Sequence, residues 1–479
     1  MVLGLMVPLM PVGVTLRVVA VLMLGLVLML AWLLRSRSRG LPARWVERGL
    51  LLTVALSILW PRFIFFPLGG AYTNPQAASI LVMLAVCVVL LVANARLART
   101  EGFATLGLWR MGWLILAWFA WRFVSSVSGD NAVSSTFLLL KELAYLTSFI
   151  GVAALLLGFP DADRRLLRVI VFCGFLALLY GLVEALWQKN PLMRFAAGSD
   201  NEATADVLRS LTAEKIREGA YRAQSVFTHP IVFAQFVAAL LPLGLLLALT
   251  EKQDKFWRLL GLLVIPVGLA AIVKSGSRAG FVSVLAAVAI VLFVFWLRAL
   301  RGRGFGRIFA VLGGPVFLLA AAGIGWLAKG LVLGRSSMEA GSTSARVEML
   351  NLGMRSLEAH PLLGYGEGMS VMVAGLTDSK GHTSVDSYLL SLAVDGGYPS
   401  LLLYLAIVLT FFVRLAWLAA SDPGRLGLQA GLVTASLMAL VVSFIGLTIA
   451  HNMTLFWLLL VLGLFYGRRL QAGGVASRP

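Results

Sequence analysis

Long apolar segments, most of them long enough to cross a membrane as a helix, follow one another through the sequence and are separated by short polar gaps. About 20 apolar residues in a helix cross the hydrocarbon core of a bilayer, and a helix satisfies its backbone hydrogen bonds internally. Sixty per cent of the 479 residues are hydrophobic, 13% are charged, and the mean hydropathy is +0.92. Soluble domains use about 45–50% apolar and about 25% charged residues. The pattern therefore predicts an all-α, polytopic membrane helical bundle.

The apolar segments predict about 12–14 transmembrane helices. The candidate spans are 12–34, 49–66, 78–95, 111–125, 138–158, 166–187, 232–250, 258–274, 279–297, 308–327, 387–413, 427–449 and 454–467. Residues 1–14 carry no positive charge, and no small-residue cleavage site precedes a polar domain, so we expect the first segment to remain as a span. Two long gaps divide the chain into N-terminal helices (1–187), a first long loop (188–231), central helices (232–327), a second long loop (328–386) and C-terminal helices (387–479).

More than half of the 40 Lys and Arg residues lie in alternate gaps between these spans. The short gaps 67–77, 126–137 and 450–453 contain none. Cytoplasmic loops are enriched in Lys and Arg, so the basic gaps, among them 35–40 and 298–307, are predicted to be cytoplasmic and the two long loops to lie on the outer face. Topology thus accounts for the net charge of +18, and nucleic acid is not a predicted partner.

The sequence contains two cysteines, Cys87 and Cys173, and each lies inside an apolar run. We interpret both as small buried hydrophobic side chains, because a cysteine-built metal site needs more ligands. Nothing in the chain resembles a Walker A loop, a dinucleotide fingerprint or a zinc site. We therefore expect neither a cofactor nor a metal.

Both long loops are basic, which the positive-inside rule neither forbids nor requires, because long loops translocate regardless of charge. Their basic residues are Lys189, Arg194, Arg209, Lys215, Arg217 and Arg222 in the first loop and Lys329, Arg335, Arg346, Arg355 and Lys380 in the second. A basic outer face beside a cavity concentrates an anionic ligand such as a lipid phosphate. The structural alternative is an ordinary solvated loop that meets anionic headgroups.

The second loop contains RVEMLNLGMRSLE (346–358), in which Val347, Leu350, Met354 and Leu357 are spaced 3, 4 and 3 residues apart. This spacing predicts an amphipathic helix that lies in the membrane interface or packs on the ends of the spans. The glycine-rich turn HPLLGYGEG follows directly.

Two arginines in short outer-face patches are candidates for binding phosphate. Arg278 lies in SGSRAG (275–280), a tight turn between two apolar runs, where Ser275 or Ser277 can cap the following helix. A helix N-terminus and a guanidinium fork both favour phosphate; the structural alternative is a snorkelling arginine. Arg222 lies in YRAQSVFTHP and approaches the same surface, so the two arginines can bracket a pyrophosphate, or Arg222 is a solvated loop residue.

Asp386 is the candidate general base, because it stands where the second loop enters an apolar helix. Partial dehydration there raises the pKa of a carboxyl and suits it to accept a proton. The structural alternative is an N-cap, for which Asp is well suited. His382 either shares this site or is a solvated loop residue, and we interpret His229 and His451 as loop and turn residues.

Four charged residues, Arg122, Lys141, Glu142 and Glu184, lie in or near apolar runs. Charge inside a membrane normally faces the protein interior and is paired. We favour structural pairing over a transport pathway for these residues.

Four patches keep one order along the chain: YRAQSVFTHPIVFAQF, GSRAG, R-x-E-M-L followed by HPLLGYGEG, and DSYLLSLAVDGGYPSLLLY. In this order, over residues of about 215–415, they resemble the bacterial O-antigen ligase/polymerase superfamily, which are membrane glycosyltransferases of the GT-C type. The resemblance implies transfer of a glycan from undecaprenyl pyrophosphate to an acceptor hydroxyl at the periplasmic face of the inner membrane, without a metal or a nucleotide sugar. It also implies that Arg222 and Arg278 hold the pyrophosphate. Our mechanistic hypothesis adds Arg346 as a third contact.

One departure from the family's pattern concerns the base. The ligase pattern has His, then Asn, Ser or Gln, nine residues and Gly; here Ser387 and Gly397 fit, and Asp386 takes the His position. A carboxylate can deprotonate the acceptor, with inversion at the anomeric carbon, and His382 is an alternative base. This departure favours a repeat-unit polymerase for O-antigen, capsule or exopolysaccharide over an O-antigen ligase.

The implied partners are a lipid-linked glycan donor, an acceptor glycan that is either a lipid-linked repeat unit or lipid A-core, membrane lipids and a chain-length regulator protein. A transporter or flippase of lipid-linked glycans is the alternative from another class. It predicts polar residues strung through several spans and symmetry between halves. The polar residues here gather on one face of the membrane, which favours an enzyme.

Overall fold

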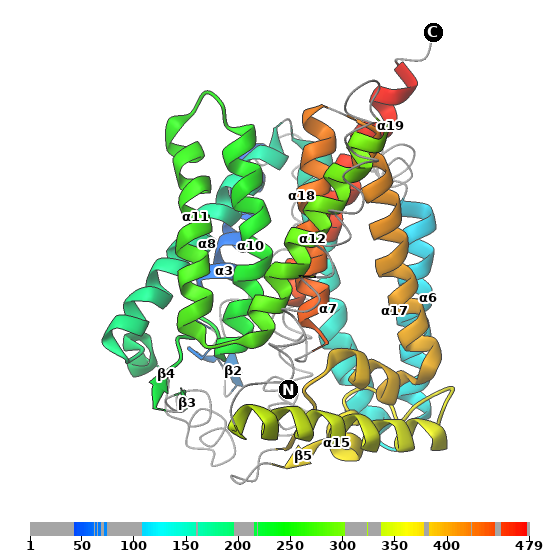
Figure 1. The fold of residues 1–479 in the computed structure, drawn as a ribbon. Coiled ribbons are helices and arrows are strands. Elements are labelled where there is room, and N and C mark those ends of the chain that lie inside the picture. The colour runs from blue at the N-terminus through cyan, green and yellow to red at the C-terminus, as the bar shows by residue number, and fades with distance from the viewer. Residues whose placement is uncertain are drawn as a thin grey trace.

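The computed structural model describes residues 43–61, 63–64, 66–68, 71–73, 108–159, 161–195, 215–217, 219–301, 323, 337–377, 383–422, 424–445 and 452–476. The predicted spans 12–34 and 78–95, most of 308–327, and the residues His382 and His451 lie outside this described part of the chain. The described part is an all-α bundle of long helices that run side by side (Figure 1).

The described helices are α3 (Ala43–Leu59), α6 (Leu108–Ser128), α7 (Ala132–Gly158), α8 (Ala162–Trp187), α10 (Pro230–Thr250), α11 (Lys255–Ser275), α12 (Arg278–Arg301), α15 (Ser337–Ala359), α16 (Ser370–Ala374), α17 (Tyr388–Ser421), α18 (Arg425–Ser443) and α19 (Met453–Ala476), with a 3-10 helix at Pro191–Phe195. The described residues also form three hairpins, whose strands are two or three residues long. They pair β1 (Phe66–Leu68) with β2 (Ala71–Thr73), β3 (Ile216–Arg217) with β4 (Ala220–Tyr221), and β5 (Leu376–Thr377) with β6 (Thr383–Ser384). All three pairings are antiparallel.

Eight helices among the described residues are long and apolar enough to cross a membrane: α6, α8, α10, α11, α12, α17, α18 and α19. The prediction of a polytopic, all-α membrane protein is confirmed.

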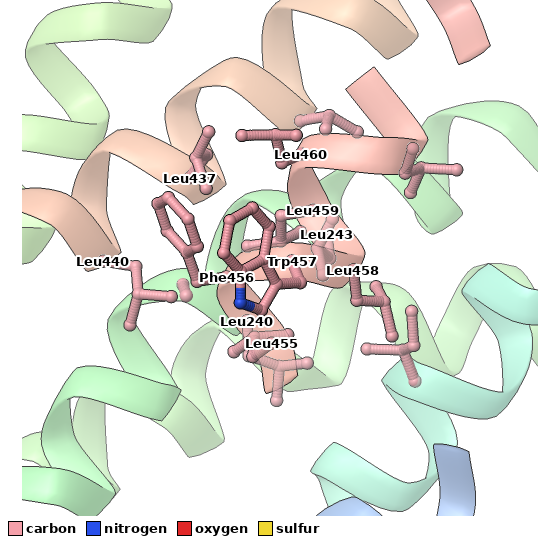
Figure 2. Close-up of a cluster of buried hydrophobic side chains, with 14 of the residues drawn as sticks. Leu240, Leu243, Leu437, Leu440, Leu455, Phe456, Trp457, Leu458, Leu459 and Leu460 are labelled. Atoms are coloured by element: carbon pink, nitrogen blue, oxygen red, sulfur yellow. The ribbon is translucent and has the colours of Figure 1, made fainter. Parts of the chain in front are cut away.

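Helix α10 lies at the centre of the bundle and packs against α8, α11, α12 and α18. A helix that is apolar all round is typical of a buried position, and almost all of α10 is buried. In Figure 2 its Leu240 and Leu243 meet Leu437 and Leu440 of α18 around the aromatic side chains of Phe456 and Trp457 from α19.

Helix α17 is broken near its beginning, where the sequence predicted one span over 387–413. Gly397 has φ 71° and ψ 179°, which is not a helical conformation, and Pro399 has no N–H to donate. The first part, 388–396, is about 13 Å long at 1.5 Å per residue and is too short to cross a membrane. The break therefore leaves a short helix at one end of the bundle, followed by the long remainder of α17.

Helix α15 lies across that same end of the bundle, crosswise to the long helices (Figure 1). We call this the α15 end. Its amphipathic character was predicted, but Val347, Leu350 and Met354 of the predicted stripe are exposed. The face that packs carries Met349 and Gly353, because Gly353 has no side chain to hold Leu390 of α17 away.

Candidate functional site

The carboxylate of Glu184, near the C-terminal end of α8, holds the segment that carries Arg222. Glu184 is fully buried and accepts hydrogen bonds from the Tyr221 hydroxyl (2.8 Å), the Gln224 N–H (3.2 Å) and the Ser225 N–H (2.6 Å). Glu184 therefore faces the protein interior, where neutral donors satisfy its carboxylate.

Ser225 is held from two further sides. Its hydroxyl donates to the Ala177 carbonyl (2.7 Å), and its own carbonyl accepts from Asn190 Nδ2 (2.9 Å). Ser225 has φ 56°, a conformation that non-glycine residues rarely adopt. This residue persists in a strained conformation because the surrounding hydrogen bonds require it, and the segment before α10 is rigid as a result.

Arg222 lies against the turn that precedes Arg278. Its Nε donates to the Ser275 carbonyl (2.9 Å), and the next N–H, of Ala223, donates to the Lys274 carbonyl (3.0 Å). Gly276 has φ 58°, and a Cβ there would lie 3.2 Å from Arg222 Nε, so a glycine suits this turn on both counts. The structure thus brings Arg222 to the turn of Arg278, although the two lie in segments far apart in sequence.

Arg278 is the first residue of α12, and Ser277 is the capping residue. The Ser277 Oγ accepts from the Gly280 N–H (3.3 Å), while Ser275 Oγ accepts from the Ser277 N–H (3.3 Å). Of the two serines that the sequence left open, Ser277 therefore caps the helix and Ser275 braces the turn. The N-terminus of a helix carries partial positive charge and attracts anions, and here the Arg222 side chain lies at the turn that precedes it.

His229 lies next to these cations and caps α10. Its Nδ1 accepts from the Ile231 N–H (3.1 Å). Burial, with the positive charges of Arg222 and Lys215, lowers the pKa of His229 to about 3. The imidazole is therefore neutral at pH 7, and it adds a capping acceptor and no charge to this part of the site.

Asp386 does not cap α17, because Ser387 does: the Ser387 side chain accepts from the Leu390 N–H (3.4 Å). Burial raises the pKa of Asp386, while the positive charge of Arg346 and a hydrogen bond from Ser384 (3.4 Å) act in the opposite direction. The N–H of Asp386 contacts Met349 Sδ at 3.4 Å, which ties the residue to α15. The Arg346 Nε is buried and has no hydrogen-bond partner among the described residues.

The two groups, Arg222 with Arg278 and Asp386 with Arg346, lie at one end of the bundle and are joined by buried polar contacts. Gln235 of α10 donates to the Ser443 carbonyl of α18 (3.2 Å), and Asn452 Nδ2 donates to the Val232 carbonyl (3.2 Å). The next residue after Ser443, Phe444, accepts from the Tyr388 N–H (3.0 Å). The contacts of Gln235 and Tyr388 hold the beginnings of α10 and α17 to the same C-terminal end of α18, and Asn452 ties α10 to the start of α19.

Two acidic residues at this end were not identified in the sequence: Glu367, which bonds to Arg122, and Asp395, which bonds to the N–H groups of Gly368 and Ser370. Each is the single acid inside a glycine-rich motif, HPLLGYGEG and VDGGYP. A lone acid among glycines was the signal that could have found them. Among the described residues, no group of three or more His, Cys, Asp or Glu side chains could hold a metal ion.

The fold and this arrangement define a polytopic membrane protein in which Arg222, the start of α12 at Arg278 and the partly buried carboxyl of Asp386 lie at one end of the bundle. Residues 262–405 match the family model described as O-antigen ligase, and the match includes Arg278, Arg346 and Asp386. It confirms the resemblance to the O-antigen ligase/polymerase superfamily and supports a membrane glycosyltransferase of that type. A comparison with curated proteins found no match.

Proposed function

We propose that this protein is a repeat-unit polymerase that moves a glycan from undecaprenyl pyrophosphate to a hydroxyl of a second lipid-linked glycan. The observation that carries the proposal is the position of Asp386, a partly buried carboxyl beside Arg346, at the same end of the bundle as Arg222 and Arg278. The product of this reaction would be an O-antigen, capsule or exopolysaccharide chain.

We place the reaction at the periplasmic face of the bacterial inner membrane. Helix α12 begins at Arg278 near the α15 end and finishes with Arg298 and Arg301 at the other. That other end also carries Arg164 and Arg168, which bond to Glu251. Arginine gathered at one end of the spans favours a cytoplasmic location for that end, which leaves the α15 end outside.

In the proposed mechanism the donor pyrophosphate lies between Arg222 and Arg278, at the N-terminus of α12. The bond between the anomeric carbon and the pyrophosphate oxygen breaks, and the two guanidinium groups stabilise the charge that develops on the leaving group. These groups and the helix N-terminus supply positive charge of the kind that metal ions supply elsewhere. We therefore propose a metal-independent reaction.

The acceptor hydroxyl gives its proton to Asp386 as its oxygen attacks the anomeric carbon. The attack comes from the face opposite the leaving pyrophosphate, so the configuration inverts. A carboxyl whose pKa is raised by burial accepts a proton more readily than an ordinary aspartate. Arg346 keeps this carboxylate ionised, because its positive charge lowers the pKa that burial raises.

The second candidate is an O-antigen ligase that transfers the glycan to lipid A-core, and the description of the matched family favours it. The aspartate at position 386, where the ligase pattern has histidine, favours the polymerase.

Deletion of the gene in the native host, with the surface polysaccharides resolved by gel, separates the two candidates. A polymerase deletion leaves single repeat units on lipid A-core, or removes a capsule or secreted polymer while other ligation continues. A ligase deletion leaves full-length polymer on undecaprenyl pyrophosphate. Complementation by the wild type and not by Asp386→Ala is expected, and unchanged glycans in the deletion would contradict both candidates.

A further inference from the structure

A buried ion cluster joins α6 and α7 to the glycine-rich turn after α15. Arg122 of α6 is 1% exposed. Its Nε donates to Glu367 Oε2 (3.1 Å) and its Nη2 to Glu367 Oε1 (2.7 Å), and Nη2 also pairs with Glu142 of α7. The guanidinium carbon lies 4.5 Å from the centre of the Trp118 ring. Arg122 therefore holds Glu367 in a bidentate pair whose geometry a flexible lysine cannot reproduce.

The turn that carries Glu367 bonds to the backbone of α17 where that helix breaks. In an unbroken helix, the Val394 carbonyl would accept from the N–H of residue 398 and the Asp395 carbonyl from that of residue 399. Residue 399 is proline, and the Tyr398 N–H donates instead to the Pro361 carbonyl (2.9 Å). The freed carbonyls accept from the turn: Tyr365 N–H bonds to Val394 (3.0 Å) and Gly366 N–H to Asp395 (2.9 Å).

Side chains at the same place complete the joint between turn and helix. The Asp395 carboxylate accepts from the N–H groups of Gly368 (3.0 Å) and Ser370 (2.6 Å). From α6, the Trp121 indole N–H donates to the Gly396 carbonyl (2.9 Å) and the Ser125 hydroxyl to the Asp395 carbonyl (2.7 Å). The end of the short segment 388–396 is thus fixed to both the turn and α6.

The beginning of the same segment is tied to the same cluster. The Tyr388 hydroxyl donates to Glu142 Oε1 (3.3 Å), and Glu142 pairs with Arg122. Asp386 lies two residues before Tyr388 and has no capping role in the helix. Its position therefore depends on how segment 388–396 is held.

We propose that Arg122 and Glu367 are positioning residues that fix segment 388–396 and thereby keep Asp386 partly buried beside Arg346. Neither touches the reacting atoms of the proposed transfer. The role of Asp386 as a base rests on the proposed function, whereas its placement by the cluster does not. Buried ion pairs stabilise a fold little more than apolar side chains of the same volume, so a cluster at this joint is better explained by the geometry it specifies.

The test measures how accessible position 386 is. Cys87 and Cys173 are replaced by serine and alanine, respectively, and Asp386→Cys is introduced into that background. The labelling rate of the purified protein with a hydrophilic maleimide reports on burial at this position. Arg122→Lys and Glu367→Gln, each added separately, are expected to raise this rate by roughly tenfold, because loss of a buried charge pair allows local opening.

Glu251→Gln is the matched control, because Glu251 is also fully buried and pairs with two arginines, Arg164 and Arg168, at the other end of the bundle. It is expected to leave the labelling rate at position 386 unchanged. Trp187→Cys, at a position that is 67% exposed, controls for reagent access. Unchanged labelling at 386 in both Arg122→Lys and Glu367→Gln would overturn the proposal, and so would an equal rise in Glu251→Gln.

Labelling needs no turnover, so its outcome is separate from that of the proposed function. With Asp386 present, Glu367→Gln is expected to lower kcat and leave the KM for the donor unchanged, since Arg222 and Arg278 lie on other elements. Glu367→Asp should recover part of kcat, because it keeps the charge. A rise in labelling together with full activity of Asp386→Asn would support the positioning role and overturn the proposed base.

Discussion

Ser387 caps helix α17 through its side-chain oxygen, which accepts from the Leu390 N–H at 3.4 Å, and this leaves its neighbour Asp386 without a capping role. The carboxyl of Asp386 is instead partly buried and lies near the positive charge of Arg346. A partly buried carboxylate without a capping role in the helix is a candidate for chemistry.

Asp386→Asn is expected to lower turnover by about 10²–10⁴-fold, the usual contribution of a general base. Donor binding should change little, because the proposed pyrophosphate contacts are on α12 and on the segment before α10. Polymer formation in proteoliposomes, with kcat and KM determined separately, checks this. Equal losses in both constants would indicate that Asp386 is structural.

Arg278→Lys is expected to remove most of the activity, by about 10²-fold or more, since a point charge cannot reproduce a bidentate fork on the leaving pyrophosphate. Arg298→Lys, at the opposite end of the same helix, is the control and should retain wild-type turnover. Turnover near the wild-type value in Arg278→Lys would show that Arg278 does not bind the leaving pyrophosphate through a bidentate fork.

The dependence of kcat on pH should follow the raised pKa of Asp386. A base acts in its deprotonated form, so activity falls as the pH drops through that pKa, and the fall should begin above the ordinary aspartate value of about 3.9. Arg346→Met removes the charge that lowers this pKa, so the fall of kcat at low pH should begin at a higher pH in this variant. An unchanged profile of kcat against pH in Arg346→Met would show that Arg346 does not act on Asp386.

Glu251 should make stability depend on pH at the other end of the bundle. A hydrogen bond from Arg164 comes first among the causes that lower the pKa of Glu251 from 4.5 to about 2. Because the folded pKa is depressed, the stabilisation is present above 4.5 and is lost as the pH falls towards 2. Glu251→Gln should lower the free energy of unfolding by about 1–3 kcal/mol at neutral pH. This range allows for solvent screening of the partly exposed Arg164. Thermal unfolding in detergent at several pH values measures this, and an identical acid profile in wild type and variant would contradict it.

Gly397→Ala is expected to destabilise the protein by several kcal/mol, on the order of 3. Gly397 has φ 71°, and a Cβ there would overlap the Leu362 carbonyl oxygen. Gly112→Ala in α6 is the control, because a Cβ there meets nothing within 4 Å. Replacing a helical glycine by alanine in open space stabilises a protein by about 0.4–1 kcal/mol. Thermal unfolding of the two variants should therefore shift in opposite directions.

The membrane class and most of the described spans were predictable from the sequence, because the length of an apolar segment is a local property that decides whether a helix can cross a bilayer. The sequence also predicted Arg222, Arg278, Arg346 and Asp386 as candidate site residues, from charged side chains in the outer loops and turns. It also predicted a helix over 346–358 from the period of its apolar residues, although Val347, Leu350 and Met354 of the predicted stripe are exposed.

Which of these residues lie together became visible in the folded protein alone. Glu184 bonds to Tyr221 and Ser225, on either side of Arg222. These bonds join α8 to residues about 40 positions later and hold Arg222 at the turn that precedes Arg278. The break at Gly397 and the pairing of Glu367 with Arg122 likewise depend on carbonyls and charges brought together from distant segments. The local period of apolar residues does not predict such contacts, because each forms only when the helices have packed.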